Sequence, residues 1–139
     1  MARKQVRVGI VCSRFNEEIT SRMKDAAIRA AKEKGAKIMA IVDVPGAFEI
    51  PLAADRLLAR KDIDAVAAVG TVIKGETRHD EVITFAICKT LLEIQLRRRK
   101  PIGLGISGPG ITEDQARERA EGYAQRAICA ALELAGNKG

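Results

Sequence analysis

The sequence predicts one α/β domain, spanning residues 1–139, in which a four-stranded parallel sheet lies between two layers of helices. Short apolar segments alternate along the chain with longer segments that have helical periodicity. The apolar segments carry few polar side chains in their interiors, which is typical of parallel strands covered on both faces. The length of 139 residues is that of a single ordinary domain.

The first strand is predicted over residues 6–12, and helical spacing follows over residues 17–34. One face of this helix carries the apolar side chains that we expect to be buried, namely Ile19, Met23, Ala26, Ala27 and Ala30. Gly35 follows the helix and ends it, as glycine commonly does.

The second strand is short and is predicted over residues 37–42. Pro45-Gly46 then marks a turn, because both residue types favour turn geometry. A helix is predicted over residues 48–60, with Pro51 in its first turn, where the missing proline N–H costs little.

The third strand is predicted over residues 64–70, a loop over residues 71–78 and a long helix over residues 79–99. The side chains of this helix that we expect to face inward are Val82, Ile83, Ala86, Ile87, Leu91 and Ile94. Pro101 prevents the helix from continuing.

The fourth strand is predicted over residues 102–106, and a second loop over residues 107–110. Thr112 is expected to cap the last helix, which runs to about residue 135. Its packed side chains are predicted to be Ala116, Ala120, Ala124, Ala127, Ile128, Ala131 and Leu132. Residues 136–139 are expected to form a frayed tail.

Right-handed crossovers between these parallel strands lead to a flavodoxin-like three-layer α/β/α sandwich. Ligands of such sheets bind beyond the carboxyl ends of the strands. This rule predicts that the ligand site is formed by four segments, residues 13–16, 44–49, 71–79 and 107–112.

The charge of the chain is +6, with a pI near 9.5, which permits nucleic-acid binding. We expect no nucleic-acid partner, because acids are interleaved with the bases and the chain has three Phe, one Tyr and no Trp. Phosphorylated or carboxylated metabolites suit a positive charge. The densest basic run, Arg97-Arg98-Arg99-Lys100, ends a predicted helix, where we expect it to be solvated.

No apolar run approaches the ~20 residues of a membrane span, so we expect no membrane partner. The chain begins with a strand rather than a signal peptide, which favours a cytoplasmic location. The three cysteines, Cys12, Cys88 and Cys129, have no metal-ligand spacing and are interpreted as buried reduced thiols, although Cys12 lies close to the candidate site.

The segment of residues 71–79 carries the most chemistry. Gly75 permits close approach of a ligand, and the amides of Glu76 and Thr77, with the Thr77 hydroxyl, are suited to an anion at a helix start. His79 is the only histidine of the chain. Proton transfer is the favoured role for His79, and a surface or capping residue is the alternative.

Two further segments leave their alternatives open. Phe15 can stack on a ligand ring or pack beneath its own loop. Glu49, after the glycine turn, can accept hydrogen bonds from ligand hydroxyls or serve only as an acid in the first turn of a helix. Arg117, Arg119 and Arg126 of the last helix are each expected to be solvated. These residues alone indicate a small α/β domain that binds a phosphorylated metabolite.

Three elements together resemble the lumazine synthase family over nearly the whole chain. Residues 44–51, VPGAFEIP, are similar to its V-P-G-A-x-E-x-P element, and residues 70–79, GTVIKGETRH, to its G-x-V-I-[RK]-G-x-T-x-H element. Phe15-Asn16 with Ile19 matches its F-N-x-x-I element. Glu76, Leu104 and residues 107–110 differ from many bacterial members. Glu76 and residues 105–110, GISGPG, resemble the archaeal-type branch.

The resemblance implies a transferase of riboflavin biosynthesis. It would condense 5-amino-6-ribitylamino-uracil with 3,4-dihydroxy-2-butanone 4-phosphate to give 6,7-dimethyl-8-ribityllumazine, phosphate and water. It implies no cofactor and no metal. By position, the implied substrate-binding residues are Phe15, Asn16, Gly46, Ala47, Phe48, Glu49, Thr71, Val72, Ile73 and Leu104. The implied phosphate-binding residues are Gly75, Glu76, Thr77 and Arg119, and His79 is the implied catalytic proton carrier.

The resemblance also implies a homo-oligomer built from pentamers, with the site between adjacent subunits, and in some members an icosahedral capsid. The rival closest to this interpretation is an archaeal-type riboflavin synthase, which dismutates two lumazines. A non-catalytic flavin-binding protein is a second alternative, but this chain lacks the phosphate loop that such a protein is expected to carry after residues 6–12. A purely structural cage protein has no need of His79 and Arg119.

Overall fold

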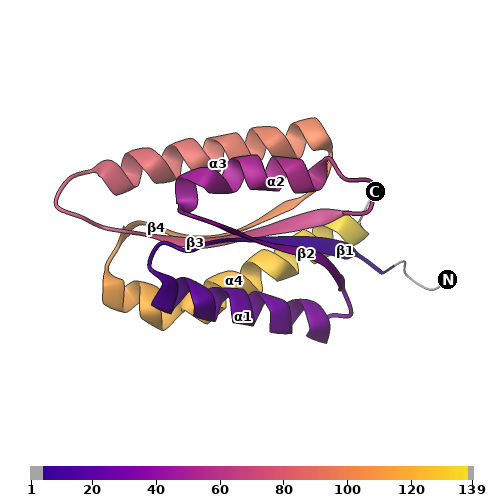
Figure 1. Cartoon of the computed structure of the whole chain (residues 1–139), viewed down its shortest axis with the longest axis horizontal. Coiled ribbons are helices and arrows are strands. Elements are labelled where there is room, and N and C mark those ends of the chain that lie inside the picture. Colours follow the sequence, from indigo (N-terminus) through magenta and orange to yellow (C-terminus); the bar gives the residue numbers. More distant parts are fainter. Residues whose placement is uncertain (1–4, 138–139) are drawn as a thin grey trace.

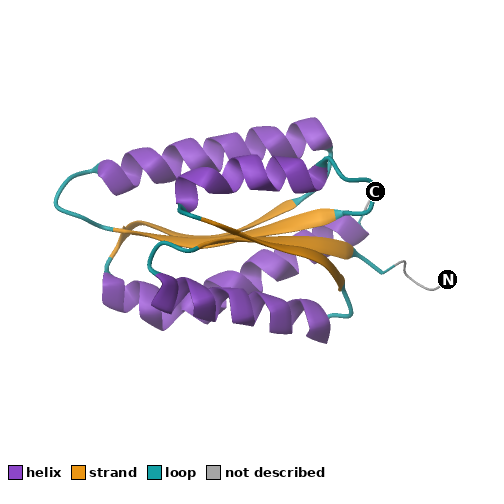
Figure 2. Cartoon of the chain, in the orientation of Figure 1, coloured by secondary structure: helices purple, strands orange, loops and turns teal. Residues whose placement is uncertain are grey.

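The computed structural model describes residues 5–137 and has the predicted alternation of strands and helices (Figure 1). The elements are β1 (Arg7–Ser13), α1 (Glu17–Glu33), β2 (Lys37–Val44), the 3-10 helix η1 (Ala47–Glu49), α2 (Ile50–Leu58), β3 (Ala65–Ile73), α3 (His79–Arg98), β4 (Ile102–Ile111) and α4 (Glu113–Gly136). The four strands are parallel, in the order β2-β1-β3-β4. Helices α1 and α4 cover one face of the sheet and α2 and α3 the other (Figure 2), which confirms the three-layer prediction.

The strand order places the candidate site. The chain moves from β1 outward to β2, returns to the other side of β1 as β3, and continues to β4. The direction therefore reverses between β1 and β3, and such a switch point is where open α/β sheets bind ligands. Figure 1 shows the connection from β3 to α3 extending beyond the strand ends on this side, opposite the N-terminus.

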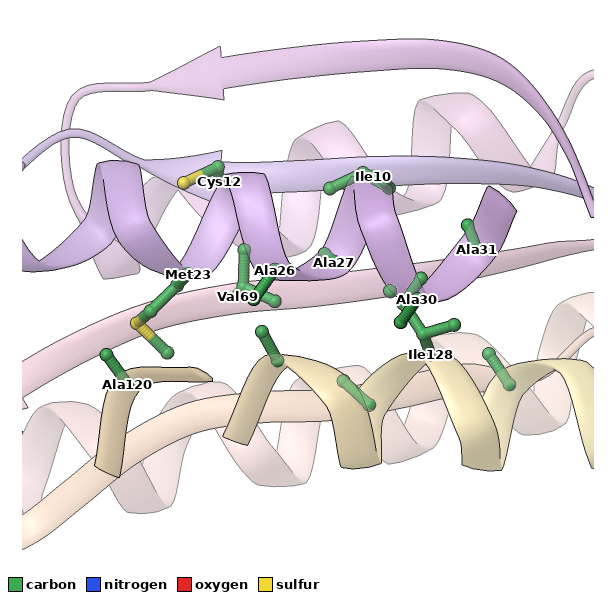
Figure 3. Close-up of a cluster of buried hydrophobic side chains, with 14 of the residues drawn as sticks. Ile10, Cys12, Met23, Ala26, Ala27, Ala30, Ala31, Val69, Ala120 and Ile128 are labelled. Carbon is green, nitrogen blue, oxygen red and sulfur yellow. The ribbon is translucent and has the colours of Figure 1, made fainter. Parts of the chain in front are cut away.

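An alanine-rich core joins α1 and α4 to the sheet. Met23, Ala26, Ala27 and Ala30 of α1 are buried, as predicted, and Figure 3 shows Met23 directed toward Ala120 and Ala30 beside Ile128 of α4. The expected packed face of α4 is also present, with Leu132 only partly buried. Because alanine side chains are small, the two helices pack closely over Ile10, Cys12 and Val69 of the sheet.

The second core lies under α2 and α3, and here one prediction is wrong. Ile87, Leu91 and Ile94 are buried as expected, but Val82 and Ala86 are exposed. Helix α3 is apolar on two opposite sides, so its periodicity does not reveal which side meets the sheet. The buried stripe begins at Asp80 and Thr84, and the exposed apolar residues of the opposite stripe are Val82, Phe85, Leu92 and Leu96.

Both strands that lead into the expected loops are longer than predicted. β3 runs to Ile73 and β4 to Ile111, so residues 71–73 and 107–110 are strand rather than loop. Thr71 pairs with Ser107 and Ile73 with Ile111, with a register shift between the two pairs. Gly108 and Gly110 adopt φ values of +119° and +75°, which only glycine takes readily, and thereby extend pairing through a glycine-proline sequence.

Several element ends follow the prediction. Gly35 has φ +76° after α1, and Pro51 lies in the first turn of α2. The hydroxyl of Thr112 accepts a hydrogen bond from Gln115 N at 3.2 Å, and Gln115 Oε1 accepts one from Thr112 N at 3.0 Å, which forms a capping box. β2 is two residues longer than expected, and the helix predicted from residue 48 is η1 followed by α2.

The ends of the chain limit two predictions. Gly136 still belongs to α4, whereas residues 138–139 of the expected tail and residues 1–4 lie outside the described part. Within residues 5–137, no helix combines the length and the apolar character that a membrane span requires.

The basic run at the end of α3 is partly solvated, as expected, with Arg97 and Arg99 exposed, but three of its four side chains also make contacts within the chain. Arg97 and Arg98 donate to the Asp55 carboxylate of α2 at 2.8 and 2.9 Å, and Lys100 Nζ donates to the carbonyl of Leu58 at 3.0 Å. These contacts fasten the end of α3 to α2.

Candidate functional site

The first two candidate segments meet at the carboxyl edge of the sheet. Arg14 N donates to the carbonyl of Val44 at 2.8 Å, and Phe15 N donates to the carbonyl of Pro45 at 3.0 Å. These backbone hydrogen bonds extend the pairing of β1 with β2 into the segments that follow both strands. Phe15 therefore lies beside the glycine turn, as a shared site requires.

Both phenylalanine rings at this edge are exposed. Phe15 is 70% exposed and Phe48 is 69% exposed, although large apolar side chains are normally buried. The alternative that Phe15 packs beneath its own loop is therefore wrong. Asn16, which follows, has φ +64° and makes no side-chain cap to α1, so its amide is not used for capping.

The turn at Gly46 brings its backbone close to the carboxylate of Glu49. Gly46 is extended, and its carbonyl accepts from Glu49 N at 3.2 Å, which closes η1. A Cβ on Gly46 would lie 3.4 Å from Glu49 Oε1, so the Glu49 carboxylate lies close to this glycine. Ala47 is buried, whereas the exposed Glu49 carboxylate accepts no hydrogen bond from the described part of the chain. This free acceptor is suited to ligand hydroxyls.

The β3–α3 loop is open to solvent. Val72 and Ile73 are half-buried at the end of β3, and all six residues from Lys74 to His79 are exposed. Among residues 5–137, the amides of Gly75, Glu76 and Thr77 find no hydrogen-bond acceptor. Free amides at a helix start are natural donors to an anion.

Thr77 and His79 contact each other inside this loop. Thr77 Oγ1 accepts a hydrogen bond from His79 N at 3.3 Å, so the hydroxyl oxygen caps the start of α3. The imidazole of His79 is exposed and makes no hydrogen bond to the described chain. His79 is therefore neither a buried structural histidine nor a side-chain cap.

Three residues of the predicted site lie apart from this loop. The Thr71 side chain is buried, and its hydroxyl accepts from Ser107 Oγ at 2.7 Å, so only its backbone borders the site. Leu104 pairs with Ala68 in the middle of β4 and is half-exposed there. Arg119 belongs to α4, which covers the opposite face of the sheet from α3, and no hydrogen bond or ion pair joins Arg119 to His79 among residues 5–137.

The three arginines of α4 differ in their contacts, contrary to the expectation that each is simply solvated. Arg117 binds Glu18 at 3.1 Å and also pairs with Glu113 and Asp114, and Arg126 lies 5.0 Å from the centre of the Tyr123 ring. Arg119 is exposed and forms no ion pair with any residue from 5 to 137. Only Arg119 of the three keeps its guanidinium free for a ligand.

The cysteines take no part in this edge. All three are free, and only Cys12 is fully buried, since Cys88 and Cys129 are half-buried. Burial raises the pKa of the Cys12 thiol to about 11. Its Sγ contacts the Thr20 carbonyl at 3.4 Å, toward α1 and away from the loop.

Asp80 is a residue whose importance the sequence alone did not reveal. Its side chain is 6% exposed, and Oδ2 accepts a hydrogen bond from Gly110 N at 2.8 Å. The sequence did contain one indication that Asp80 is buried. It precedes Ile87 by seven residues and Leu91 by eleven, which places it on the buried stripe of α3.

Comparison with known proteins gives a consistent result. The family model of 6,7-dimethyl-8-ribityllumazine synthase matches residues 5–138. The 6,7-dimethyl-8-ribityllumazine synthase of Metallosphaera sedula is 47% identical over 135 residues, which cover 97% of this chain and 89% of that protein. The enzymes of the same name from Methanopyrus kandleri and Staphylothermus marinus are 45% and 46% identical, covering 94% and 92% of this chain and 92% and 85% of their own lengths. The chain therefore belongs to the 6,7-dimethyl-8-ribityllumazine synthase family, whose members are transferases of riboflavin biosynthesis.

Proposed function

We propose that the chain condenses 5-amino-6-ribitylamino-uracil with 3,4-dihydroxy-2-butanone 4-phosphate and releases 6,7-dimethyl-8-ribityllumazine, phosphate and water. The observation that carries this proposal is the β3–α3 loop. It holds three unpaired amides at Gly75, Glu76 and Thr77 and, two residues later, an exposed imidazole at His79. Loss of a phosphate group requires donors that bind the phosphate oxygens and, close by, a group that carries protons.

The proposed chemistry joins an amine of the uracil to the ketone of the butanone phosphate. The amine attacks the carbonyl carbon, and the carbonyl oxygen leaves as water when the imine forms. A proton is then removed from carbon and the phosphate leaves with its C–O electron pair. The enol that results becomes a second ketone, the ribitylamino nitrogen attacks its carbonyl carbon, and the ketone oxygen leaves as a second water when the ring closes. His79 carries protons in these steps, while the amides of Gly75, Glu76 and Thr77 hold the phosphate oxygens.

The remaining contacts hold the uracil. Phe15 offers an exposed ring on which the pyrimidine stacks, and Glu49 offers a free carboxylate to the ribityl hydroxyls. Asn16, Gly46, Ala47 and Phe48 lie around the same turn, and Thr71, Val72 and Ile73 supply backbone groups at the end of β3.

Magnitudes rank these roles. Holding two reactants in register supplies about 7–11 kcal/mol of barrier lowering. A general acid–base group supplies ~100- to 10,000-fold, or about 3–5 kcal/mol. Because an amine and a ketone react without help, positioning is the larger contribution, and His79 accelerates a reaction that binding already permits.

We further propose that the site is completed by a second copy of the chain. The loop that holds His79 is open to solvent, whereas Arg119 and Leu104 are exposed on other parts of the surface. A head-to-tail contact between copies would place the Arg119 and Leu104 of one copy beside the loop of the next, and such contacts form a ring when the rotation between copies closes. The ring we propose is a pentamer, the building block of any larger shell.

The exposed stripe of α3 supports assembly. Val82, Phe85, Leu92 and Leu96 are each more than half exposed on one side of this helix. Apolar side chains aligned along a helix are the usual surface for packing against another helix. The stripe is exposed rather than packed against another element of residues 5–137, so a neighbouring copy is its proposed partner.

The test is an assay of the purified protein with both substrates, in which lumazine is followed by absorbance and fluorescence against a protein-free control. We expect a protein-dependent rate that saturates in both substrates. If the rate stays at the uncatalysed background, the proposal fails. Lumazine supplied alone then tests the rival activity, riboflavin synthesis.

A further inference from the structure

Two consecutive residues of β4 hold both ends of the β3–α3 loop. At the entry, Lys74 N donates to the carbonyl of Ile111 at 2.8 Å. At the exit, Gly110 N donates to Oδ2 of Asp80, also at 2.8 Å. Between these points, the hydrogen bonds that residues 75–78 make within the described chain are local: Thr77 Oγ1 accepts from His79 N, and the Arg78 carbonyl accepts from Glu81 N and Val82 N in the first turn of α3.

Of these two contacts, only the one at the exit of the loop involves a side chain, that of Asp80. Asp80 is buried directly after the exposed His79, so holding the Asp80 carboxylate holds the backbone from which the imidazole projects. Gly110 has φ +75° and presents its N–H toward α3 from the end of a strand. Two contacts to neighbouring residues of one strand therefore set the span between the free amides and His79.

We propose that Asp80 is a positioning residue, whose hydrogen bond to Gly110 N fixes His79 relative to the amides of Gly75, Glu76 and Thr77. The inference rests on the proposed function, because it gives His79 and these amides a common substrate. Misplacement of a reacting group by about 1 Å costs up to about 100-fold in rate. A loop that is exposed along its length gains its geometry from its two ends.

The neighbouring acid provides a matched control. Glu81 lies in the same first turn of α3 and carries the same charge, but within residues 5–137 its carboxylate makes no hydrogen bond and no ion pair. If an acid at this helix end acts only through the helix dipole, Asp80 and Glu81 contribute alike. If the hydrogen bond to Gly110 matters, the two differ.

The kinetic experiment compares Asp80→Ala, Asp80→Asn and Glu81→Ala in the full-length protein. Asp80→Ala is expected to lower kcat for lumazine formation about 10- to 100-fold while the KM for the uracil stays within about threefold. Asp80→Asn keeps an oxygen that accepts from Gly110 N, so kcat should return to within about fivefold of wild type. Glu81→Ala should match the wild type. An unchanged kcat for Asp80→Ala, or an Asp80→Asn variant as slow as Asp80→Ala, overturns the proposal.

Hydrogen exchange tests the contact without catalysis. The Gly110 amide should be protected in the wild type and in Asp80→Asn, and should exchange at least about tenfold faster in Asp80→Ala. Rapid exchange of Gly110 in the wild type overturns the proposal even if Asp80→Ala fails to fold. If the wild type forms no lumazine, the proposed function fails, and exchange at Gly110 still decides whether Asp80 holds the loop.

Discussion

The hydroxyl of Ser107 donates a hydrogen bond to the hydroxyl of Thr71 across 2.7 Å, and both side chains are buried. The two residues are register partners at the ends of β4 and β3. Thr71 shares its face of β3 with Val69, so the pair belongs to the layer of α1 and α4. The hydroxyl of Thr71 therefore secures the strand ends beneath the loop rather than contacting a substrate.

Replacing Thr71 with Val should lower the free energy of unfolding by about 1–3 kcal/mol, because the buried Ser107 hydroxyl loses its acceptor. Urea unfolding measures the change. Ser107→Ala should also destabilise, and the double variant should lose less than the sum of the two. The control is Thr90→Val, an exposed helix threonine that bonds only its own Ala86 carbonyl. Equal stability of the Thr71 and Thr90 variants would contradict the role of the pair.

The architecture was predictable because burial of strands on both faces leaves a simple pattern in the sequence. The strand ends were not, because Gly108-Pro109-Gly110 has turn chemistry by local preference. Those glycines instead permit the positive φ values that carry β4 past a register shift to Ile111. Pairing with β3 thus overrides the local signal, and pairing is a property of two distant segments.

The site was predictable to the level of segments. Parallel strands end at one edge, so the segments that contain Phe15, Glu49 and His79 had to meet there. The distinction between Asp80 and Glu81 was not predictable, because it depends on which acid reaches Gly110. The orientation of α3 was also hidden, because the helix presents one apolar stripe to its own sheet and another outward.

The exposed stripe of α3 should be sensitive to charge. Leu92→Glu places a carboxylate on a side chain that is 58% exposed in the single chain and is proposed to be buried between copies. We expect light scattering after gel filtration to show species smaller than the wild-type assembly. Leu134→Glu is the control, because Leu134 is similarly exposed, at 54%, but lies on α4. A Leu92→Glu protein of wild-type mass would show that the stripe does not hold copies together.

The contact between α2 and α3 should make stability depend on acid pH. The hydrogen bond from Arg98, followed by that from Arg97, lowers the pKa of Asp55 in the folded protein. A lowered folded pKa gives stability that is present above the unfolded value, about 3.9, and is lost as the pH falls through the folded value. The Tm of the wild type should exceed that of Asp55→Asn near pH 7, and the gap should close below about pH 4.

The control for this prediction is Asp25→Asn, which removes an exposed carboxylate that makes no hydrogen bond within the described chain. Its Tm should follow the wild type across the same pH range. A Tm gap for Asp55→Asn that is as large at low pH as at neutral pH would show that the ion pair with Arg97 and Arg98 is not its source.

Two glycines should respond oppositely to alanine. A Cβ on Gly103 would lie 2.7 Å from the carbonyl carbon of Ala127 and closer still to its oxygen, so β4 and α4 would have to separate. Gly103→Ala should destabilise by about 1–3 kcal/mol. Gly122→Ala should stabilise α4 by about 0.5–1 kcal/mol, because its Cβ meets only the mobile end of Arg126, at 3.4 Å. Urea unfolding measures the change in the free energy of unfolding for both variants. An unchanged value for Gly103→Ala would contradict the close approach of β4 to α4.

A site shared between copies should be recoverable from two defective variants. His79→Ala should lower kcat by ~100- to 10,000-fold without abolishing the reaction, because binding still positions both reactants. Arg119→Ala should mainly raise the KM for the butanone phosphate, because the free guanidinium of α4 is the proposed phosphate partner. Steady-state kinetics in both substrates separates the two effects. A wild-type rate for His79→Ala removes the proton-transfer role, and an unchanged KM for Arg119→Ala removes the arginine from the phosphate site.

Co-assembly of the two variants then tests where Arg119 acts. In rings formed at random from equal amounts, about a quarter of the junctions pair a natural His79 with a natural Arg119 of the neighbour. At low butanone phosphate, the mixed rings should show about a quarter of the wild-type rate, whereas the variants assembled separately and then combined should stay near their own low rates. If both residues act within one chain, no junction of a mixed ring is restored. Absence of recovery after co-assembly would therefore show that Arg119 and His79 do not act together across the contact between copies.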